Sequence, residues 1–443
     1  MYPAANGKSV RVWAVGLGLL IVLNLWGVAR WHYDDGLQDS FENLDTRVIL
    51  QRLQQPHSVW AWFVGDWVLG NGFYRPLPSV LYQVDYWLWG GDLLRWKWTN
   101  GLLATAAALA LVGFLHTLTG RRSVAFVGGL AFTLWQTGFA PPVPLWVGFG
   151  ALAAGIVWGY RWGDWRRGAV WGAVAFALVV EWGFLDRLPD IHTQSFAYRA
   201  MGWIPGRTAT LLTLFALLAL WGVAGYARTR RAHWAVLGVG GFVGAMLSYE
   251  QFFALPLLMA LTVWATGVPR ALAIRAWGVC LACALLLAPY AIFYRAHIPT
   301  QTQYHQQRIK RVKTLPLTAT GWLAPPALET WTQVDLSFTA PFNLLFPRFW
   351  LAQVGLVAYL IALRYGLRWR CGWVGWLGSL LAYAPAAPLL PLMHYYYLPA
   401  ALRALWWGIL IACLSTLRPT RKAISVAMGD AMYPKRLSPP STS

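Results

Sequence analysis

Two adjacent carboxylates, Asp34 and Asp35, closely follow the first long apolar run of the chain. Such a pair can act as a general base, or can share a divalent cation between its oxygens. A cation held by Asp34 and Asp35 is the one cofactor that the sequence suggests, and whether it binds is left open. Asp-Asp-Gly is also good turn chemistry, so a solvated turn is the alternative.

Arg75 and Glu250 are the next candidates, because both stand beside apolar segments. A guanidinium makes two-point contacts to phosphate, so Arg75 is a candidate phosphate ligand; contact with any lipid headgroup is the alternative. Glu250 lies in Ser-Tyr-Glu-Gln (248–251) at a predicted membrane boundary. A carboxylate there is costly unless it is paired or functional, which makes Glu250 a candidate second catalytic acid.

A third group of candidates could bind a sugar or a lipid phosphate. His394, Tyr395 and Tyr396 begin the last apolar segment and suit a polar headgroup or a sugar; the usual aromatic belt of membrane proteins is the alternative. The main basic cluster of the long segment 295–348 would attract a lipid phosphate, or simply anionic lipid. This cluster contains His305, Arg308, Lys310 and Arg311.

The composition shows which elements must position these residues. Of the 443 residues, 58% are hydrophobic and 12% are charged, against roughly 25% charged in soluble proteins. Apolar runs of roughly 16–22 residues fit membrane helices and not barrel strands, so the sequence predicts an all-α polytopic membrane protein. About twelve membrane helices are predicted, at 11–30, 97–118, 122–138, 142–160, 168–183, 206–226, 233–249, 252–268, 273–294, 349–364, 372–389 and 395–416.

The net charge of +20 is explained by orientation in the membrane. With a cytoplasmic N-terminus, every arginine-rich short loop falls on the cytoplasmic side, as the positive-inside rule requires. All acids except Asp164 and Asp430 then fall outside. We therefore expect a protein of the cytoplasmic (inner) membrane with both termini in the cytoplasm and an extracytoplasmic working surface. No nucleic-acid partner is needed, and no nucleic-acid-binding motif is present.

Four regions follow from this topology. Residues 1–294 form the predicted main transmembrane module, which includes a long first outer loop at 31–96 with juxtamembrane helices. Residues 295–348 form a second outer loop, 349–416 the last membrane helices, and 417–443 a basic tail. Segment 76–91 is predicted to be an amphipathic helix in the membrane interface. Its aromatic residues suit the headgroup level, namely Tyr82, Tyr86, Trp87 and Trp89.

Together, the order and spacing of these motifs resemble the GT-C superfamily of membrane glycosyltransferases over roughly residues 30–400. The resemblance includes the acidic pair after the first helix, Phe-Tyr-Arg-Pro-Leu at 73–77 and Asn100 in the second membrane helix. Ser-Tyr-Glu at 248–250 and His-Tyr-Tyr-Tyr-Leu-Pro at 394–399 look like signatures of protein-O-mannosyltransferase-like and related bacterial members. The stretch 135–141 departs from the pattern, because many relatives carry an acid or His-Pro there.

The resemblance implies a catalytic, GT-C-like module and a polyprenyl-phosphate-linked sugar donor within membrane lipid. One of Asp34 and Asp35 would deprotonate an acceptor hydroxyl, which attacks the anomeric carbon with inversion. Arg75 and the basic residues of 308–313 would hold the departing lipid phosphate, with Glu250 as a second acid. The acceptor could be a glycan, a lipid or a protein.

Three other functions are open. A transporter or flippase of lipid-linked saccharides would place charged or helix-breaking residues at mid-membrane, and the sequence shows few charges there. An enzyme like the O-antigen ligases would depend on Arg308 and His305 and not on the acidic pair. A non-catalytic scaffold would make the pair incidental.

Overall fold

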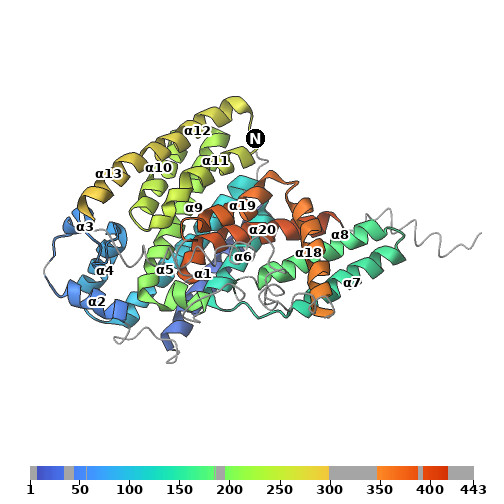
Figure 1. Cartoon of the computed structure of the whole chain (residues 1–443), viewed down its shortest axis with the longest axis horizontal. Helices are drawn as coiled ribbons and strands as arrows, with labels where there is room; N and C mark the ends of the chain where they lie inside the picture. Colours follow the sequence, from blue (N-terminus) through green and yellow to red (C-terminus); the bar gives the residue numbers. More distant parts are fainter. Residues whose placement is uncertain are drawn as a thin grey trace, which may run out of the picture.

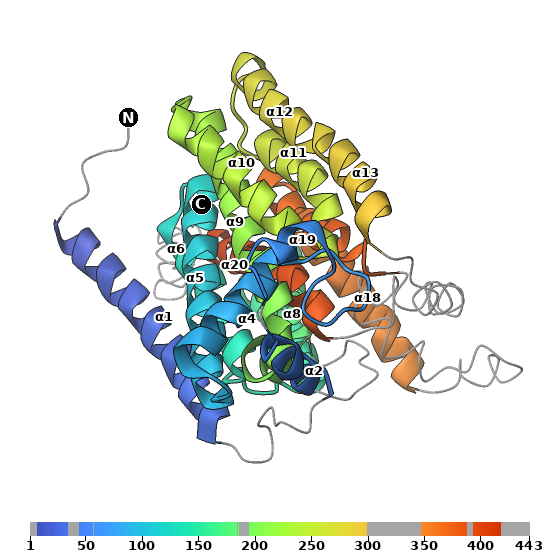
Figure 2. The same ribbon diagram turned by 90° about the vertical axis from the view of Figure 1, so that its left-hand side faces the viewer.

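The computed structural model describes residues 7–33, 44–55, 57–183, 185, 195–298, 347–387 and 393–417. Within these ranges all regular secondary structure is helical, and no strand occurs. The helices lie side by side in a bundle, which Figure 1 and Figure 2 show from two directions. The prediction of an all-α chain is confirmed for the described ranges.

A helix occupies each apolar segment in which the sequence predicts one. The bundle helices are α1 (Gly7–Tyr33), α5 (Leu93–Thr119), α6 (Arg122–Thr137), α7 (Leu145–Arg161), α8 (Trp165–Trp182), α9 (Arg207–Thr229), α10 (Ala232–Met246), α11 (Leu255–Ala265), α12 (Arg270–Leu285), α13 (Leu287–His297), α18 (Pro347–Gly366), α19 (Arg370–Tyr383) and α20 (Tyr397–Thr416).

Five helical segments of the described chain are long and apolar enough to cross a membrane. They are Val12–Arg30, Leu93–Thr119, Ile204–Thr229, Arg270–His297 and Met393–Thr416. These segments indicate a helical membrane protein. The larger number of crossings in the sequence prediction stays a prediction.

Helix ends follow local chemistry. The Asp92 side chain caps α5 by accepting hydrogen bonds from the backbone N–H groups of Leu94 and Arg95. The same helix ends at Gly120, whose φ of +68° favours glycine. Gly138, with a φ of +73°, ends α6 in the same way. The chain can therefore reverse direction sharply between neighbouring helices.

Helices α7 and α8, side by side in Figure 1, approach each other through glycines. Gly155 and Gly159 of α7 face Gly168 and Gly172 of α8. A Cβ atom added at Gly168 would lie 2.4 Å from the carbonyl oxygen of Gly155. Small residues let helix backbones pack closely in apolar surroundings, where hydrophobic burial adds little.

The arginine-rich loops after α5, α9 and α18 meet at one end of the bundle. The Arg121 guanidinium after α5 lies 4.2 Å from the centre of the Trp369 ring, between α18 and α19. Arg228, near the end of α9, donates a hydrogen bond of 2.9 Å to the Leu118 carbonyl. The positive-inside prediction requires this grouping of cationic loops, and the membrane side that they face stays a prediction.

Three short helices of the first predicted outer loop form a small cap. They are α2 (Leu44–Leu53), α3 (Ala61–Val64) and α4 (Pro76–Trp89), which lie close together in Figure 1. They share a hydrophobic core with Trp96 and Ile204. Tyr82 of α4, one of the aromatic residues predicted at the headgroup level, is enclosed by protein: it is fully buried, and its hydroxyl donates to the Ile204 carbonyl at 3.1 Å.

A buried ion pair joins the cap to the bundle. Arg207 of α9 donates from Nη2 to Asp85 Oδ2 of α4 at 2.5 Å. The Nε atom of the same arginine donates to Asn100 Oδ1 of α5 at 2.9 Å. Thr99 donates to the other Asp85 oxygen at 2.8 Å. Burial raises the pKa of Asp85, while the Arg207 charge and these hydrogen bonds act in the opposite direction. The pair fixes α4 against α5 and α9.

We predict that Gly168→Ala lowers the melting temperature of the detergent-purified protein by several degrees, because its Cβ would meet backbone on the facing helix. Gly150→Ala is the matched control on α7, where an added Cβ meets nothing within 4 Å. Alanine also favours helix over glycine by up to about 1 kcal/mol, so the control should be neutral or stabilising. Equal destabilisation by both changes would rule out close glycine packing as the cause.

We also predict that Asp85→Asn destabilises the protein by about 3–5 kcal/mol, because it leaves the Arg207 charge buried without its carboxylate partner. Chemical denaturation followed by tryptophan fluorescence would measure this loss. Asp92→Asn is the control: its ion pair with Arg95 is exposed, and asparagine caps a helix as well as aspartate does. A loss below about 1 kcal/mol for Asp85→Asn would contradict the proposed role of the pair.

Candidate functional site

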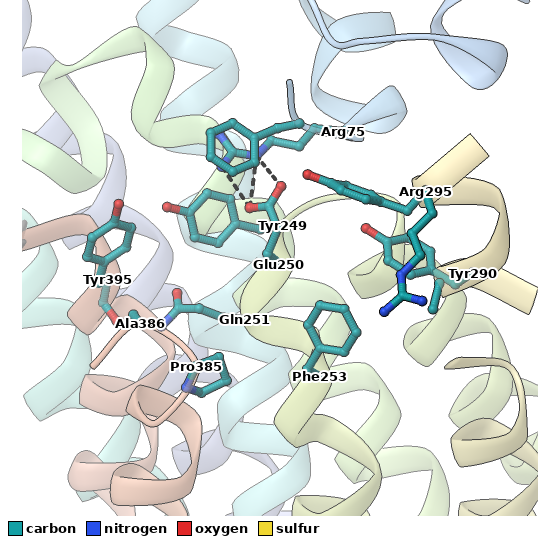
Figure 3. Close-up of a pocket in the computed structure, with 13 residues that line it drawn as sticks. Arg75, Tyr249, Glu250, Gln251, Phe253, Tyr290, Arg295, Pro385, Ala386 and Tyr395 are labelled. Atoms are coloured by element: carbon teal, nitrogen blue, oxygen red, sulfur yellow. Dashed lines mark hydrogen bonds and ion pairs between the residues drawn. The ribbon is translucent and has the colours of Figure 1, made fainter. Parts of the chain in front are cut away.

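A cavity of about 270 Å³ lies where the cap meets the bundle (Figure 3). The walls are formed by residues 73–75 before α4, by the 3-10 helix η5 (Glu250–Ala254) and by α13. Pro385 and Ala386, which follow α19, and Tyr395, which precedes α20, complete them. Aromatic and aliphatic side chains make up most of the wall, and Glu250, Arg75 and Arg295 carry its charges. Such a mixture is typical of ligand sites.

Arg75 and Glu250 form a two-point ion pair in this cavity. Arg75 Nε donates to Glu250 Oε1 at 2.9 Å, and Nη2 donates to Oε2 at 2.7 Å. The Arg75 side chain is 9% exposed and that of Glu250 is 25% exposed. The sequence selected both residues, and the structure shows that they are partners.

Three aromatic rings enclose the Arg75 guanidinium. Its central carbon lies 4.4 Å from the ring centre of Trp67, 4.2 Å from Phe73 and 4.3 Å from Tyr249. A cation over the face of an aromatic ring is attracted by the negative charge density there. The rings and the carboxylate together fix the plane of Arg75, so that Glu250 is presented to the cavity in one orientation.

The backbone before Arg75 is held by the Asp66 carboxylate. Asp66 accepts hydrogen bonds from the N–H groups of Gly72 at 2.6 Å and Phe73 at 3.0 Å. Gly72 has a φ of +80°, a conformation that favours glycine, and its carbonyl accepts a 2.7 Å hydrogen bond from the Tyr294 hydroxyl. Tyr74 donates to a backbone carbonyl, and burial raises the pKa of its hydroxyl, which therefore stays neutral.

Arg295 is a cavity residue that the sequence reasoning missed. It lies near the end of α13, is exposed, and makes no ion pair or hydrogen bond within the described part of the chain. Figure 3 draws its side chain among the residues that line the cavity. The sequence could have indicated it, because Arg295 stands one residue beyond the predicted helix 273–294 and therefore at a predicted membrane boundary. Arg295 can accept an anionic ligand without first breaking a protein contact.

Of the aromatic motif before α20, Tyr395 lines the cavity. Its backbone carbonyl accepts a 2.9 Å hydrogen bond from Gln251 Nε2, and its ring centre lies 6.1 Å from that of Tyr249. The structure therefore brings Tyr395 to the same site as Arg75 and Glu250, although these residues are far apart in the sequence.

His394 and Tyr396 are buried beside the cavity and do not line it. The His394 ring packs against Trp203 with ring centres 5.2 Å apart. The Tyr396 ring stacks on Tyr383 at 5.1 Å and is fully buried. Their side chains contribute to packing here, and a role in binding stays a prediction.

Six predicted site residues lie outside the described residues. They are Asp34, Asp35, His305, Arg308, Lys310 and Arg311. Helix α1 runs to Tyr33, the residue before the acidic pair. Among the described residues no group of three or more His, Cys, Asp or Glu could hold a metal ion, so a cation at the acidic pair stays a prediction.

The bundle interior holds a further ion pair that sequence reasoning did not foresee. Arg403 Nε of α20 lies 3.3 Å from Glu181 Oε2 at the end of α8, and both side chains are fully buried. The Tyr359 hydroxyl of α18 donates a hydrogen bond to the other carboxylate oxygen. Glu181 lies in the last turn of α8, and Arg403 lies inside the apolar span Met393–Thr416. The sequence prediction of few charges within the membrane-spanning segments therefore has an exception in Arg403.

Comparisons with protein-family models, with curated proteins and with solved structures each found no match for this chain. The chemistry of the site therefore has to be argued from its own residues. It offers an oriented carboxylate, an accessible guanidinium and tyrosine hydroxyls above an apolar wall.

We predict that Arg75→Lys destabilises the protein by about 1–3 kcal/mol, because an ammonium cannot reproduce the two parallel hydrogen bonds or the stacking between rings. Thermal unfolding in detergent would measure the change. Arg295→Lys is the control, since Arg295 is exposed and makes no contact of this kind within the described chain. Similar losses of stability in both variants would mean that the enclosed Arg75–Glu250 pair does not stabilise the protein more than an exposed arginine does.

Proposed function

We propose that this chain is an integral membrane glycosyltransferase of the GT-C type, which moves a sugar from a polyprenyl-phosphate-linked donor to an acceptor with inversion. The observation that carries the proposal is the cavity between cap and bundle, with Glu250 held by Arg75 and with Arg295 accessible. Its position beside apolar helices suits a donor that resides in the bilayer.

The donor would fit the cavity by its three chemical parts. Arg295 would contact the phosphate and stabilise the charge that develops on it as the sugar departs. Tyr290, Tyr294 and Phe73 supply aromatic surface and hydroxyl groups for a sugar ring. The apolar chain would lie along the outward side of α13, where the Ile292 side chain is 71% exposed.

The reaction needs a base and a leaving group. One of Asp34 and Asp35 would take the proton from the acceptor hydroxyl while its oxygen bonds to the anomeric carbon. The bond from that carbon to the phosphate oxygen breaks, and the lipid phosphate leaves with the electron pair. Glu250, oriented by Arg75, would hydrogen-bond sugar hydroxyls or the acceptor.

The proposed location is the cytoplasmic membrane, with the cavity on the extracytoplasmic side and both termini in the cytoplasm. Support comes from the positive-inside rule and from the grouping of the arginine-rich loops after α5, α9 and α18. Sugar would then be delivered outside the cell membrane to a glycan, a lipid or a protein.

A flippase of lipid-linked saccharides is the second candidate, favoured by the buried Arg403–Glu181 pair. Intramembrane ion pairs often mark a substrate or proton path. The Tyr359 hydroxyl donates a hydrogen bond to the Glu181 carboxylate of this pair, a contact that a purely structural pair would also use.

We predict that purified protein releases sugar from a radiolabelled polyprenyl-phosphate-hexose, to water or to an added acceptor. The Asp34→Asn/Asp35→Asn double variant should lose about a hundredfold to ten-thousandfold of the rate, because the general base is removed. Asp92→Asn serves as the control, since this exposed acid caps α5. Arg295→Ala should raise the donor KM about tenfold, while Arg270→Ala, at the opposite end of the same predicted span, should not.

Other outcomes would reject the proposal. Labelled lipid that crosses proteoliposomes without release of sugar would identify a flippase. Turnover that survives the double variant and disappears in Arg308→Ala or His305→Ala would identify the ligase-like mechanism. Unchanged melting temperatures of all variants would show that the changes in rate and KM report on function and not on misfolding.

A further inference from the structure

A second pocket, of about 540 Å³, lies on the cap. It is formed by the end of α2, the segment 57–58 and the later turns of α4. Its lining includes Leu53, Gln54, Gln55, His57, Gln83 and Trp87. None of the described residues that line it is a carboxylate, a lysine or an arginine, which distinguishes it from the charged cavity before α4.

Two lining residues of this pocket, His57 and Gln83, share a network of contacts with Trp62. Trp62 Nε1 donates to Gln83 Oε1 at 2.5 Å, and Gln83 Nε2 donates to the His57 carbonyl at 2.8 Å. The His57 ring stacks on Trp62 with ring centres 5.0 Å apart and an angle of 13° between planes. These pre-organised contacts mean that a ligand would not have to order these side chains on binding.

The polar groups of the pocket include both donors and acceptors. His57 Nδ1 lies 2.8 Å from the Gln55 carbonyl, which can only accept, so Nδ1 carries the hydrogen and Nε2 is an acceptor in the neutral ring. Gln54 and Gln55 are exposed, and their side-chain amides make no hydrogen bond within the described chain. These amides can pair with hydroxyl groups, which also both donate and accept.

Trp87 supplies an aromatic surface at the edge of the pocket. Its side chain is 61% exposed, beside the buried amide of Gln83. A sugar ring has an apolar C–H face that packs on an aromatic ring and a rim of hydroxyl groups that pair with amides. Among the described lining residues a phosphate finds no cation, whereas a neutral ligand loses nothing by this. We propose that this pocket binds a neutral saccharide.

The pocket and the charged cavity are separate sites on one helix. Arg75 precedes α4 and borders the cavity, while Trp87 lies twelve residues further on, which is about 18 Å along a helix axis. The inference concerns binding alone and does not depend on catalysis. A saccharide could bind to the cap even if no glycosyl transfer occurs.

The test uses the full chain in lipid nanodiscs and three neutral probes: maltotetraose, mannotetraose and chitotetraose. We expect saturable binding of at least one probe, seen by saturation-transfer NMR and by quenching of tryptophan fluorescence. Trp87→Ala should weaken binding about tenfold, and Gln54→Ala/Gln55→Ala should also weaken it. Trp60→Ala is the matched control, because Trp60 is 76% exposed on the same cap and does not line the pocket.

Three results would overturn the proposal. The first is no saturable binding of any probe to wild-type protein. The second is equal weakening by Trp87→Ala and Trp60→Ala, which would identify both as interfacial tryptophans. The third is binding that survives Trp87→Ala and is lost in Glu250→Gln, which would place the saccharide in the charged cavity. Both exposed tryptophans can be replaced without opening a core, and matching melting temperatures would confirm intact folding.

Discussion

Charged side chains inside an apolar bundle have to be paired, and in this protein two such pairs fix the cap. Arg75–Glu250 holds the chain just before α4, and Asp85–Arg207 holds the helix itself. Both pairs join the predicted first outer loop to helices far along the sequence. A carboxylate removed from water without a cation costs several kcal/mol, so each pair strongly favours a single docked position of α4.

The position of α4 decides the geometry of both pockets. The segment before the helix forms a wall of the charged cavity, and its later turns form a wall of the polar pocket. A shift of α4 would therefore move Arg75 and Trp87 together. The hydrogen bonds from Trp62 to Gln83 and from Gln83 to the His57 carbonyl hold part of the lining of the pocket on the cap. The two ion pairs hold the cap against the bundle.

The sequence predicts the helices well because each apolar run carries its own signal, and the capping residue Asp92 and the glycine Gly120 mark ends locally. It does not predict the partners. Arg75 and Glu250 are 175 positions apart, and each was selected alone, as a phosphate ligand and as an acid. Tyr82 was placed in the membrane interface because an amphipathic pattern does not tell lipid from protein as the neighbour of the apolar face.

The two arginines of the cavity illustrate why environment, and not residue type, assigns roles. Arg75 is enclosed by three rings and neutralised by Glu250, so its charge is already compensated. Arg295 adds a charge that no described carboxylate of the cavity balances, which leaves the described lining with one formal positive charge. A site of this charge in apolar surroundings attracts a monoanion more strongly than a neutral sugar or a cation. A phosphodiester joined to a sugar and an apolar chain is such a monoanion, so it suits the charged cavity. The separate pocket on the cap, whose described lining is uncharged, suits a neutral ligand.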